Sequence, residues 1–190
     1  MHIVKEYQLE DNKVLRLILD EDAQSPNKWD DQNVFLVYDH KDFLVKRNGF
    51  KPRSIFDYPS EYDNYIIFTV YAYIHSGISL SLNKSIGTAK WDTSSTGFIL
   101  VKKEEILNDP KCTTKSFIGK KAKQLALELI KTWNQYLSDQ VYGYSIVEKI
   151  QCPHCNHVEI NLGDSAYGFY GNDNPRSNGM LEQIGLKIIE

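Results

Sequence analysis

The stretch Y-I-I-F-T-V-Y-A-Y-I at residues 65–74 is the longest apolar run in the chain, interrupted only by Thr69. The run is too short for a membrane-spanning helix, and its β-branched and aromatic side chains favour a buried strand. After His75-Ser76-Gly77, the segment I-S-L-S-L at residues 78–82 alternates apolar and polar side chains. A glycine inside such a run indicates a bulge or a bend. We therefore expect residues 65–74 to form the central strand of a sheet that continues through residues 78–82.

Shorter apolar segments predict the rest of the fold. Strand patterns occur at residues 13–19, 34–38, 97–101, 141–150, 158–162 and 166–170, and residues 39–64 predict a loop packed onto the body by its aromatic side chains. Apolar side chains recur at helical spacing from Ile118 to Tyr136, with Thr114 or Ser116 as the N-cap, and residues 178–189 predict a closing helix. Strands and helices do not alternate regularly. The sequence therefore predicts one α+β domain over residues 1–190, with a mainly antiparallel sheet, one long amphipathic helix and a C-terminal hairpin.

The composition is typical of a folded globular protein. Of the 190 residues, 42% are hydrophobic and 25% are charged, which is enough apolar material for an ordinary core. The N-terminus lacks the basic-then-apolar pattern of a secretory signal, and three cysteines at uneven spacing make a poor disulfide framework. We therefore expect a protein of the host cytoplasm that does not enter the membrane.

Charge is distributed unevenly along the chain. Residues 1–42 hold ten acidic and five basic side chains, whereas residues 102–131 hold eight lysines and four acids. Such asymmetry is typical of an acidic surface for a basic partner, although the solvated faces of any soluble domain can give the same pattern. With a net charge of −3, the chain is not expected to take nucleic acid as its direct target. The candidate partner-binding acids are Asp20, Glu21, Asp22, Asp30 and Asp31.

The segment C-P-H-C at residues 152–155 lies between the last two long strand patterns, so the predicted hairpin carries it at its turn. Two cysteines at this spacing are typical of half a tetrahedral zinc site, which makes Cys152 and Cys155 candidate zinc ligands. The remaining ligands have several candidate sources: His157, His75, Cys112, or the same cysteine pair of a second chain in a homodimer. Without a metal, the segment would be a tight turn between two strands.

A catalytic hypothesis centres on His75 and Asp92. A histidine held by a carboxylate could activate the hydroxyl of Ser76 or Thr93. No G-x-S-x-G motif accompanies these residues. The alternative is a histidine that caps strand backbone at a bend, so the sequence assigns no catalytic residue.

The C-terminal part of the chain is rich in tyrosine. Large aromatic side chains are usually core residues, but exposed tyrosines beside acidic loops are typical of protein interfaces. Tyr142, Tyr144 and Tyr170 are therefore candidate partner-binding residues, provided that their rings are exposed.

Five motifs follow one another along the chain: P-N-K-W-D at residues 26–30, Y-I-H-S-G-I at 73–78, W-D-T-S-S-T-G-F-I at 91–99, N-Q-Y-L at 134–137 with V-Y-G-Y at 141–144, and D-S-A-Y-G-F-Y-G at 164–171. Their order resembles a family of small proteins associated with prophages and conjugative elements of Gram-positive bacteria. The last motif of that family is D-S-C-W-G-F-Y-G, so Ala166 and Tyr167 depart from it. The resemblance implies a biological setting and no activity.

In that setting, small proteins with an acidic balance often act by occupying a basic surface of a host protein. We therefore expect an accessory protein that binds and inhibits a host defence effector: a nuclease, a CRISPR component or a restriction component. One alternative is a hydrolytic or nucleotide-directed enzyme centred on His75 and Asp92. Another is a zinc-clasped module with a structural or nucleic-acid-binding role.

Overall fold

The computed structural model describes residues 2–29, 33–83, 93–108 and 114–189. It confirms the α+β class: antiparallel strands form two sheets, one long helix is present, and the cysteine segment lies at the turn of a C-terminal hairpin. The chain packs as two compact units. We call residues 1–24 and 139–190 the hairpin unit and residues 25–138 the helix unit. The single domain over residues 1–190 stays a prediction, because compact units do not show which parts of a chain fold together.

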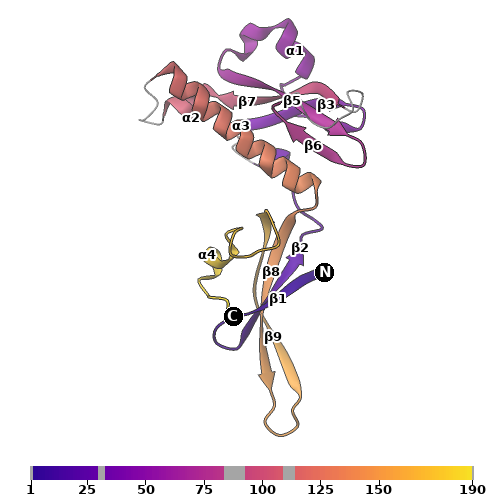
Figure 1. The fold of residues 1–190 in the computed structure, drawn as a ribbon, viewed down its shortest axis with the longest axis vertical. Helices are drawn as coiled ribbons and strands as arrows, with labels where there is room; N and C mark the ends of the chain where they lie inside the picture. Colours follow the sequence, from indigo (N-terminus) through magenta and orange to yellow (C-terminus); the bar gives the residue numbers. More distant parts are fainter. Residues whose placement is uncertain (1, 30–32, 84–92, 109–113, 190) are drawn as a thin grey trace. The chain divides into compact units, whose positions relative to one another are not determined.

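The helix unit contains a five-stranded antiparallel sheet in the order β4-β3-β7-β5-β6 (Figure 1). Its strands are β3 (Val34–His40), β4 (Phe43–Val45), β5 (Tyr65–Ile74), β6 (Ile78–Ser81) and β7 (Thr93–Lys102). The bounds predicted for β5 are confirmed, but its predicted central place is wrong. The middle strand is β7, whose apolar residues 98–101 are all buried, whereas most side chains of β5 are only half-buried.

Both faces of this sheet are covered, which explains the run of apolar side chains in β7. Ile99 and Val101 face a cluster that includes the long helix α3 (Lys115–Leu137). Phe98 and Leu100 face the opposite side, where the short helices α1 (Pro52–Asp57) and η2 (Pro59–Tyr62) cover the sheet. The predicted loop at residues 39–64 therefore contains β4, α1 and η2 and packs onto the sheet, as its aromatic side chains indicated.

Helix α3 begins as the sequence predicts, because the Thr114 side chain accepts a hydrogen bond from the Phe117 backbone N–H at 3.3 Å. Ala122, Leu129 and Trp133 are buried on its inner face. Near its C-terminal end, the Asn134 side chain bonds to both backbone groups of Leu80 in the edge strand β6, at 2.7 and 3.0 Å. The helix thus satisfies part of the unpaired edge of the sheet. The short helix α2 (Lys103–Leu107) follows β7. Among the described residues, none of the helices combines the length and the apolar composition that crossing a membrane requires.

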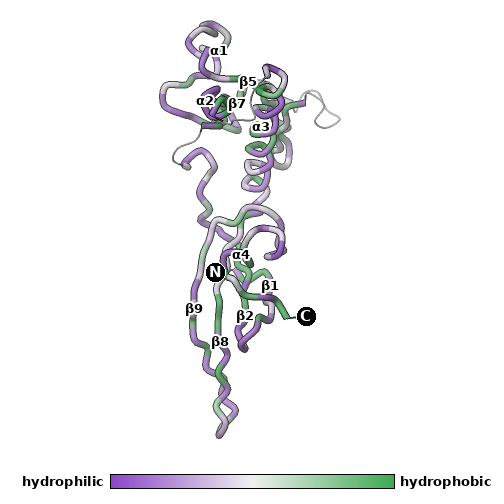
Figure 2. Tube along the Cα trace, turned by 90° about the vertical axis from the view of Figure 1, so that its left-hand side faces the viewer, coloured by the Kyte–Doolittle hydropathy of each residue, from purple (hydrophilic) through white to green (hydrophobic). Residues whose placement is uncertain are grey.

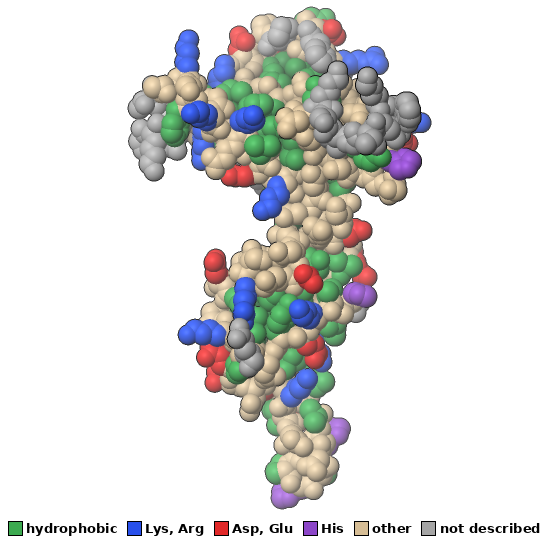
Figure 3. Space-filling model, viewed as in Figure 1, with side chains coloured by type: hydrophobic (Ala, Val, Ile, Leu, Met, Phe, Trp, Pro, Cys, Tyr) green, Lys and Arg blue, Asp and Glu red, His purple; other side chains and the backbone are tan. Residues whose placement is uncertain are grey.

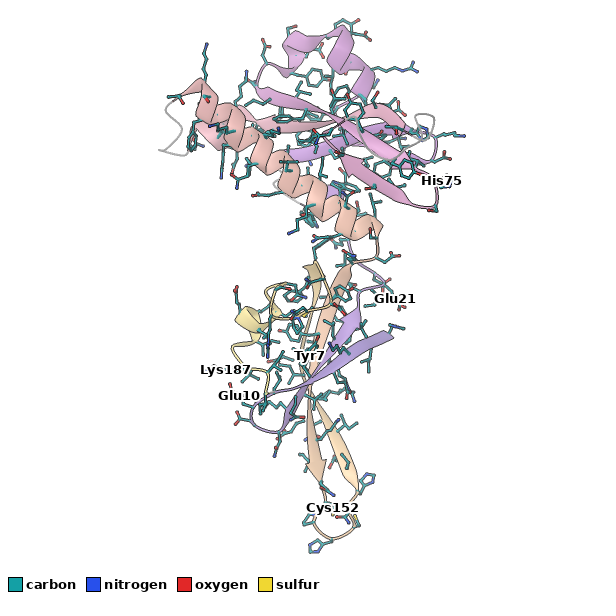
Figure 4. The ribbon with its side chains drawn as sticks, viewed as in Figure 1. Tyr7, Glu10, Glu21, His75, Cys152 and Lys187 are labelled. Carbon is teal, nitrogen blue, oxygen red and sulfur yellow. The ribbon has the colours of Figure 1, made fainter. Side chains whose placement is uncertain are left out.

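The hairpin unit is built on a four-stranded antiparallel sheet in the order β1-β2-β8-β9. Its strands are β1 (His2–Gln8), β2 (Lys13–Leu19), β8 (Val141–Gln151) and β9 (Val158–Tyr170). One face packs against the C-terminal segment, which contains the short helix α4 (Met180–Ile184), and the core there includes Leu15, Leu17 and Met180. The chain's end is tied to the turn between β1 and β2, since the Lys187 backbone N–H donates to the Glu10 carboxylate at 3.1 Å (Figure 4).

Three predicted elements differ from the observed ones. The segment at residues 166–170 is not a separate strand but the end of β9, which stays paired to β8 past a register shift. The closing helix is limited to α4, because Gly179 and Gly185 adopt left-handed φ values of 85° and 70° at its two ends. The bend predicted at His75-Ser76-Gly77 is present, but it is the turn between two antiparallel strands, β5 and β6, and does not lie within one continuous strand.

Candidate functional site

The β8–β9 hairpin extends beyond the strands that support it. The last pairing between β2 and β8 joins Lys13 to Glu148. Past that point β8 and β9 pair only with each other, through Lys149 with Ile160, Ile150 with Glu159 and Gln151 with Val158. We call residues 149–160 the ribbon. Cys152 lies at its end (Figure 4).

Backbone hydrogen bonds fix the turn at the end of the ribbon. The Cys152 backbone N–H donates to the His157 carbonyl at 2.7 Å, and the Asn156 N–H donates to the Cys152 carbonyl at 3.0 Å. Asn156 has a φ of 57°, a left-handed conformation that asparagine tolerates better than most residues. Pro153 supplies a fixed φ at the second position of the turn. Sequence and backbone geometry therefore agree on one closed turn.

Groups of this turn also act on the Cys152 thiol. Its pKa is lowered, chiefly by hydrogen bonding from the His154 backbone and then from the backbone and side chain of Cys155, because these interactions stabilise the thiolate. Cys152 and Cys155 are both free thiols. Both cysteines therefore belong to one closed turn and form no disulfide.

The third predicted ligand does not join them. No three His, Cys, Asp or Glu side chains among the described residues gather closely enough to hold one metal ion, so His157 is not grouped with the two cysteines. His154 and His157 are both exposed, and Figure 3 shows histidine side chains on the outer surface of the hairpin's end. Cys112 lies outside the described residues. Among the described residues, the turn thus holds two candidate zinc ligands, Cys152 and Cys155.

Exposed apolar side chains lead away from the turn along β9. Val158, Ile160 and Leu162 alternate along the strand, so they share one face, and they are 47%, 46% and 78% exposed. Figure 2 shows the alternation of apolar and polar residues along this part of the hairpin. β9 is also the edge strand of its sheet. An apolar row on an edge strand is typical of a surface that pairs with another protein.

The acidic residues predicted to bind a partner fall into three groups. Asp20 has a structural role, since its carboxylate accepts a hydrogen bond from the Gly168 backbone N–H at 3.1 Å. Glu21 and Asp22 are exposed in the loop that follows β2, and Figure 4 labels Glu21. Asp30 and Asp31 lie outside the described residues. Among the described candidates, Glu21 and Asp22 are therefore the exposed pair.

The three tyrosines do not form an exposed patch. Tyr144 is 4% exposed and belongs to the core of the hairpin unit, and Tyr142 and Tyr170 are half-buried. The hydroxyl of Tyr170 donates to the Gln24 carbonyl. Burial raises the pKa of Tyr142 and Tyr144 above the ordinary value, with smaller contributions from the carboxylates of Asp173 and Asp164 respectively. The exposure that the interface prediction required is absent at Tyr144.

His75 is exposed at the β5–β6 turn, with its ring centroid 6.2 Å from that of Tyr73 (Figure 4). Its backbone N–H donates to the Gly77 carbonyl at 3.1 Å. Thr93 begins β7 and pairs with Tyr73, so the candidate hydroxyl lies on a neighbouring strand. Asp92, the proposed carboxylate, lies outside the described residues. The catalytic hypothesis therefore stays a prediction.

The sequence did not indicate a cavity of about 740 Å³ in the helix unit, beside β4, α1 and η2. Its rim is mainly basic, and the Arg47 guanidinium lies 4.3 Å from the centroid of the Phe35 ring. The charged residues that line it are Asp39, Lys46, Arg47, Lys51, Arg53 and Glu61. The aromatic residues of the predicted loop indicated that it packs onto the sheet but not that a cavity forms, because the cavity depends on how three short elements pack together.

Comparisons with known proteins add no assignment: no family model, curated protein or solved structure matches this chain.

Proposed function

We propose that this chain is a binding protein of mobile-element origin that occupies a basic surface of a host defence effector through its hairpin unit. The effector is a nuclease, a CRISPR component or a restriction component. The observation that carries the proposal is the division of charge between the two units. The hairpin unit holds thirteen acidic and six basic side chains, whereas the helix unit holds twelve acidic and sixteen basic ones.

A net charge of −7 on the hairpin unit selects its partners. It repels nucleic-acid phosphates and attracts proteins that present lysine and arginine, which is how nucleic-acid-binding effectors hold their substrate. The attraction acts over about 8–10 Å at physiological salt and raises the association rate more than the final affinity. This sign of charge disfavours direct nucleic-acid binding by the hairpin unit.

The resemblance to prophage and conjugative-element proteins supports a host effector as the partner.

Charge reversal tests the proposal. The variant Glu21→Lys, Asp22→Lys and Glu159→Lys raises the net charge of the hairpin unit from −7 to −1. All three side chains are exposed, so folding should be unaffected. The measurement is inhibition of DNA cleavage by purified effectors, namely Cas9 with guide RNA and a restriction endonuclease of the host. We expect the variant to lose about tenfold or more in inhibition, and the difference to shrink at high salt.

The matched control reverses three exposed acids of the helix unit: Asp57→Lys, Asp63→Lys and Glu104→Lys. This control changes the total charge of the chain by the same amount. Comparing the two variants therefore shows whether inhibition depends on the acids of the hairpin unit or on net charge alone. Equal loss in both variants, or undiminished inhibition by the first, would refute the role given to the hairpin unit.

A further inference from the structure

The turn at the end of the ribbon has the geometry of half a metal site. Two free thiols belong to one closed turn, which is fixed by the backbone hydrogen bonds from Cys152 to His157 and from Asn156 to Cys152, at 2.7 and 3.0 Å. A turn that serves only to reverse the chain needs neither cysteine. We propose that Cys152 and Cys155 bind zinc together with the same two residues of a second copy of this chain, so that one ion joins two hairpins. This inference goes beyond the proposed function and does not depend on it.

The sulfur arrangement suits zinc. Zinc–sulfur bonds of about 2.3 Å in a tetrahedron place two sulfurs about 3.8 Å apart, close to the reach of a thiol hydrogen bond. The closed turn holds Cys152 and Cys155 three residues apart, which is the usual spacing of two zinc-ligating cysteines on one turn. Four thiolates around Zn²⁺ leave a net charge of −2, which backbone N–H groups beside the sulfurs partly offset in such sites.

The ligand count among the described residues points to a second chain. A closed structural zinc site has four protein ligands, and the described part of one chain gathers fewer than three. The turn lies on the ribbon, beyond the pairing of β8 with β2, so another copy can approach it. An identical chain supplies an identical pair in a two-fold arrangement.

The apolar row continues this contact. Val158, Ile160 and Leu162 run from the turn along the edge strand β9, and a second ribbon would bury them. In this dimer the zinc ion joins the two turns, and the apolar row adds a buried contact between the two ribbons. On assembly, four thiols lose four protons to solvent and form four zinc–sulfur bonds, with no change in oxidation state.

The test uses the full-length chain, produced without a histidine tag in zinc-supplemented medium. Elemental analysis gives the zinc content, and light scattering gives the molar mass of the same sample. We expect about half a zinc ion per chain in a dimer, and monomers after removal of zinc by a chelator. Replacement of zinc by Co²⁺ should give the absorption bands of a tetrahedral site with four thiolates.

Cysteine variants test which thiols bind zinc. Cys152→Ser and Cys155→Ser should each abolish zinc binding and leave a monomer with an unchanged circular dichroism spectrum. Cys112→Ser is the matched control and should keep both zinc and dimer. Metal-free protein under these conditions, one ion per monomer, or loss of zinc in Cys112→Ser would overturn the proposal. Inhibition of DNA cleavage, measured on the same samples, reports separately on the proposed function.

Discussion

Replacing Gly97 by alanine would place a methyl group inside the ring of Tyr38. A Cβ at this position would lie 1.9 Å from Cδ2 and 2.5 Å from Cε2 of that ring. The ring cannot swing away: Tyr38 is fully buried, its hydroxyl donates to the Ser94 carbonyl at 2.8 Å, and its centroid lies 5.1 Å from that of Phe43. Overpacking a well-packed core costs about 1–3 kcal/mol. We expect Gly97→Ala to lower the free energy of unfolding by at least that amount.

Urea unfolding of the variant and the wild type, followed by circular dichroism, measures the difference. Gly119→Ala is the control, because this glycine is exposed in α3 and a Cβ there meets nothing within 4 Å. In a helix interior, alanine is more stable than glycine by about 0.5–1 kcal/mol. The same substitution should therefore destabilise at one position and stabilise at the other. If Gly97→Ala has the same free energy of unfolding as the wild type, with the same slope against urea concentration, the packing described around β7 is refuted.

Two further predictions concern hydrogen bonds at sheet edges. Asn134→Ala removes both side-chain bonds to the Leu80 backbone and should lower the free energy of unfolding by about 1–3 kcal/mol, whereas Gln124→Ala on the exposed face of α3 should change it by less than about 0.5 kcal/mol. Similar effects of the two substitutions in urea unfolding would contradict the edge-covering role of Asn134. The Arg16 hydrogen bond lowers the pKa of Glu6 from its ordinary value of 4.5. The interaction of Arg16 with ionised Glu6 therefore stabilises the folded protein fully at pH values above 4.5, and this stabilisation is lost as the pH falls through the lowered pKa. The wild type should then lose more stability than Glu6→Gln between about pH 6 and about pH 3. Parallel pH profiles in thermal unfolding would show that this ion pair does not affect stability.

The sequence predicts those elements whose pattern depends only on local side chains. The bounds of β2 and β5 are confirmed because alternation and apolar runs mark where a strand begins and ends. The position of a strand within the sheet is not local: β7 lies at the centre because residues from both layers cover it, and its short apolar segment does not reveal that. The end of α4 was missed because glycine permits left-handed φ without requiring it.

The same distinction between local and non-local features applies to the candidate site. C-P-H-C between two strand patterns was sufficient to predict a hairpin turn that carries two adjacent cysteines, since the spacing and the proline are local. The burial of Tyr144 was not predictable, because it depends on which face of β8 meets the C-terminal segment. The charge of the hairpin unit was visible only in part, because its residues come from both ends of the chain.

We propose that this chain blocks a host defence effector, and this can be tested in infected cells. The most direct measurement is the efficiency of plaquing of a phage on Gram-positive cells that carry a CRISPR or restriction system targeting it, with and without expression of this protein. The account predicts that wild-type protein restores plaquing on the defended cells, leaves plaquing unchanged on cells that lack the system, and loses this effect when Glu21, Asp22 and Glu159 are changed to lysine. Equal plaquing on defended cells with and without the protein, across such systems, would contradict it.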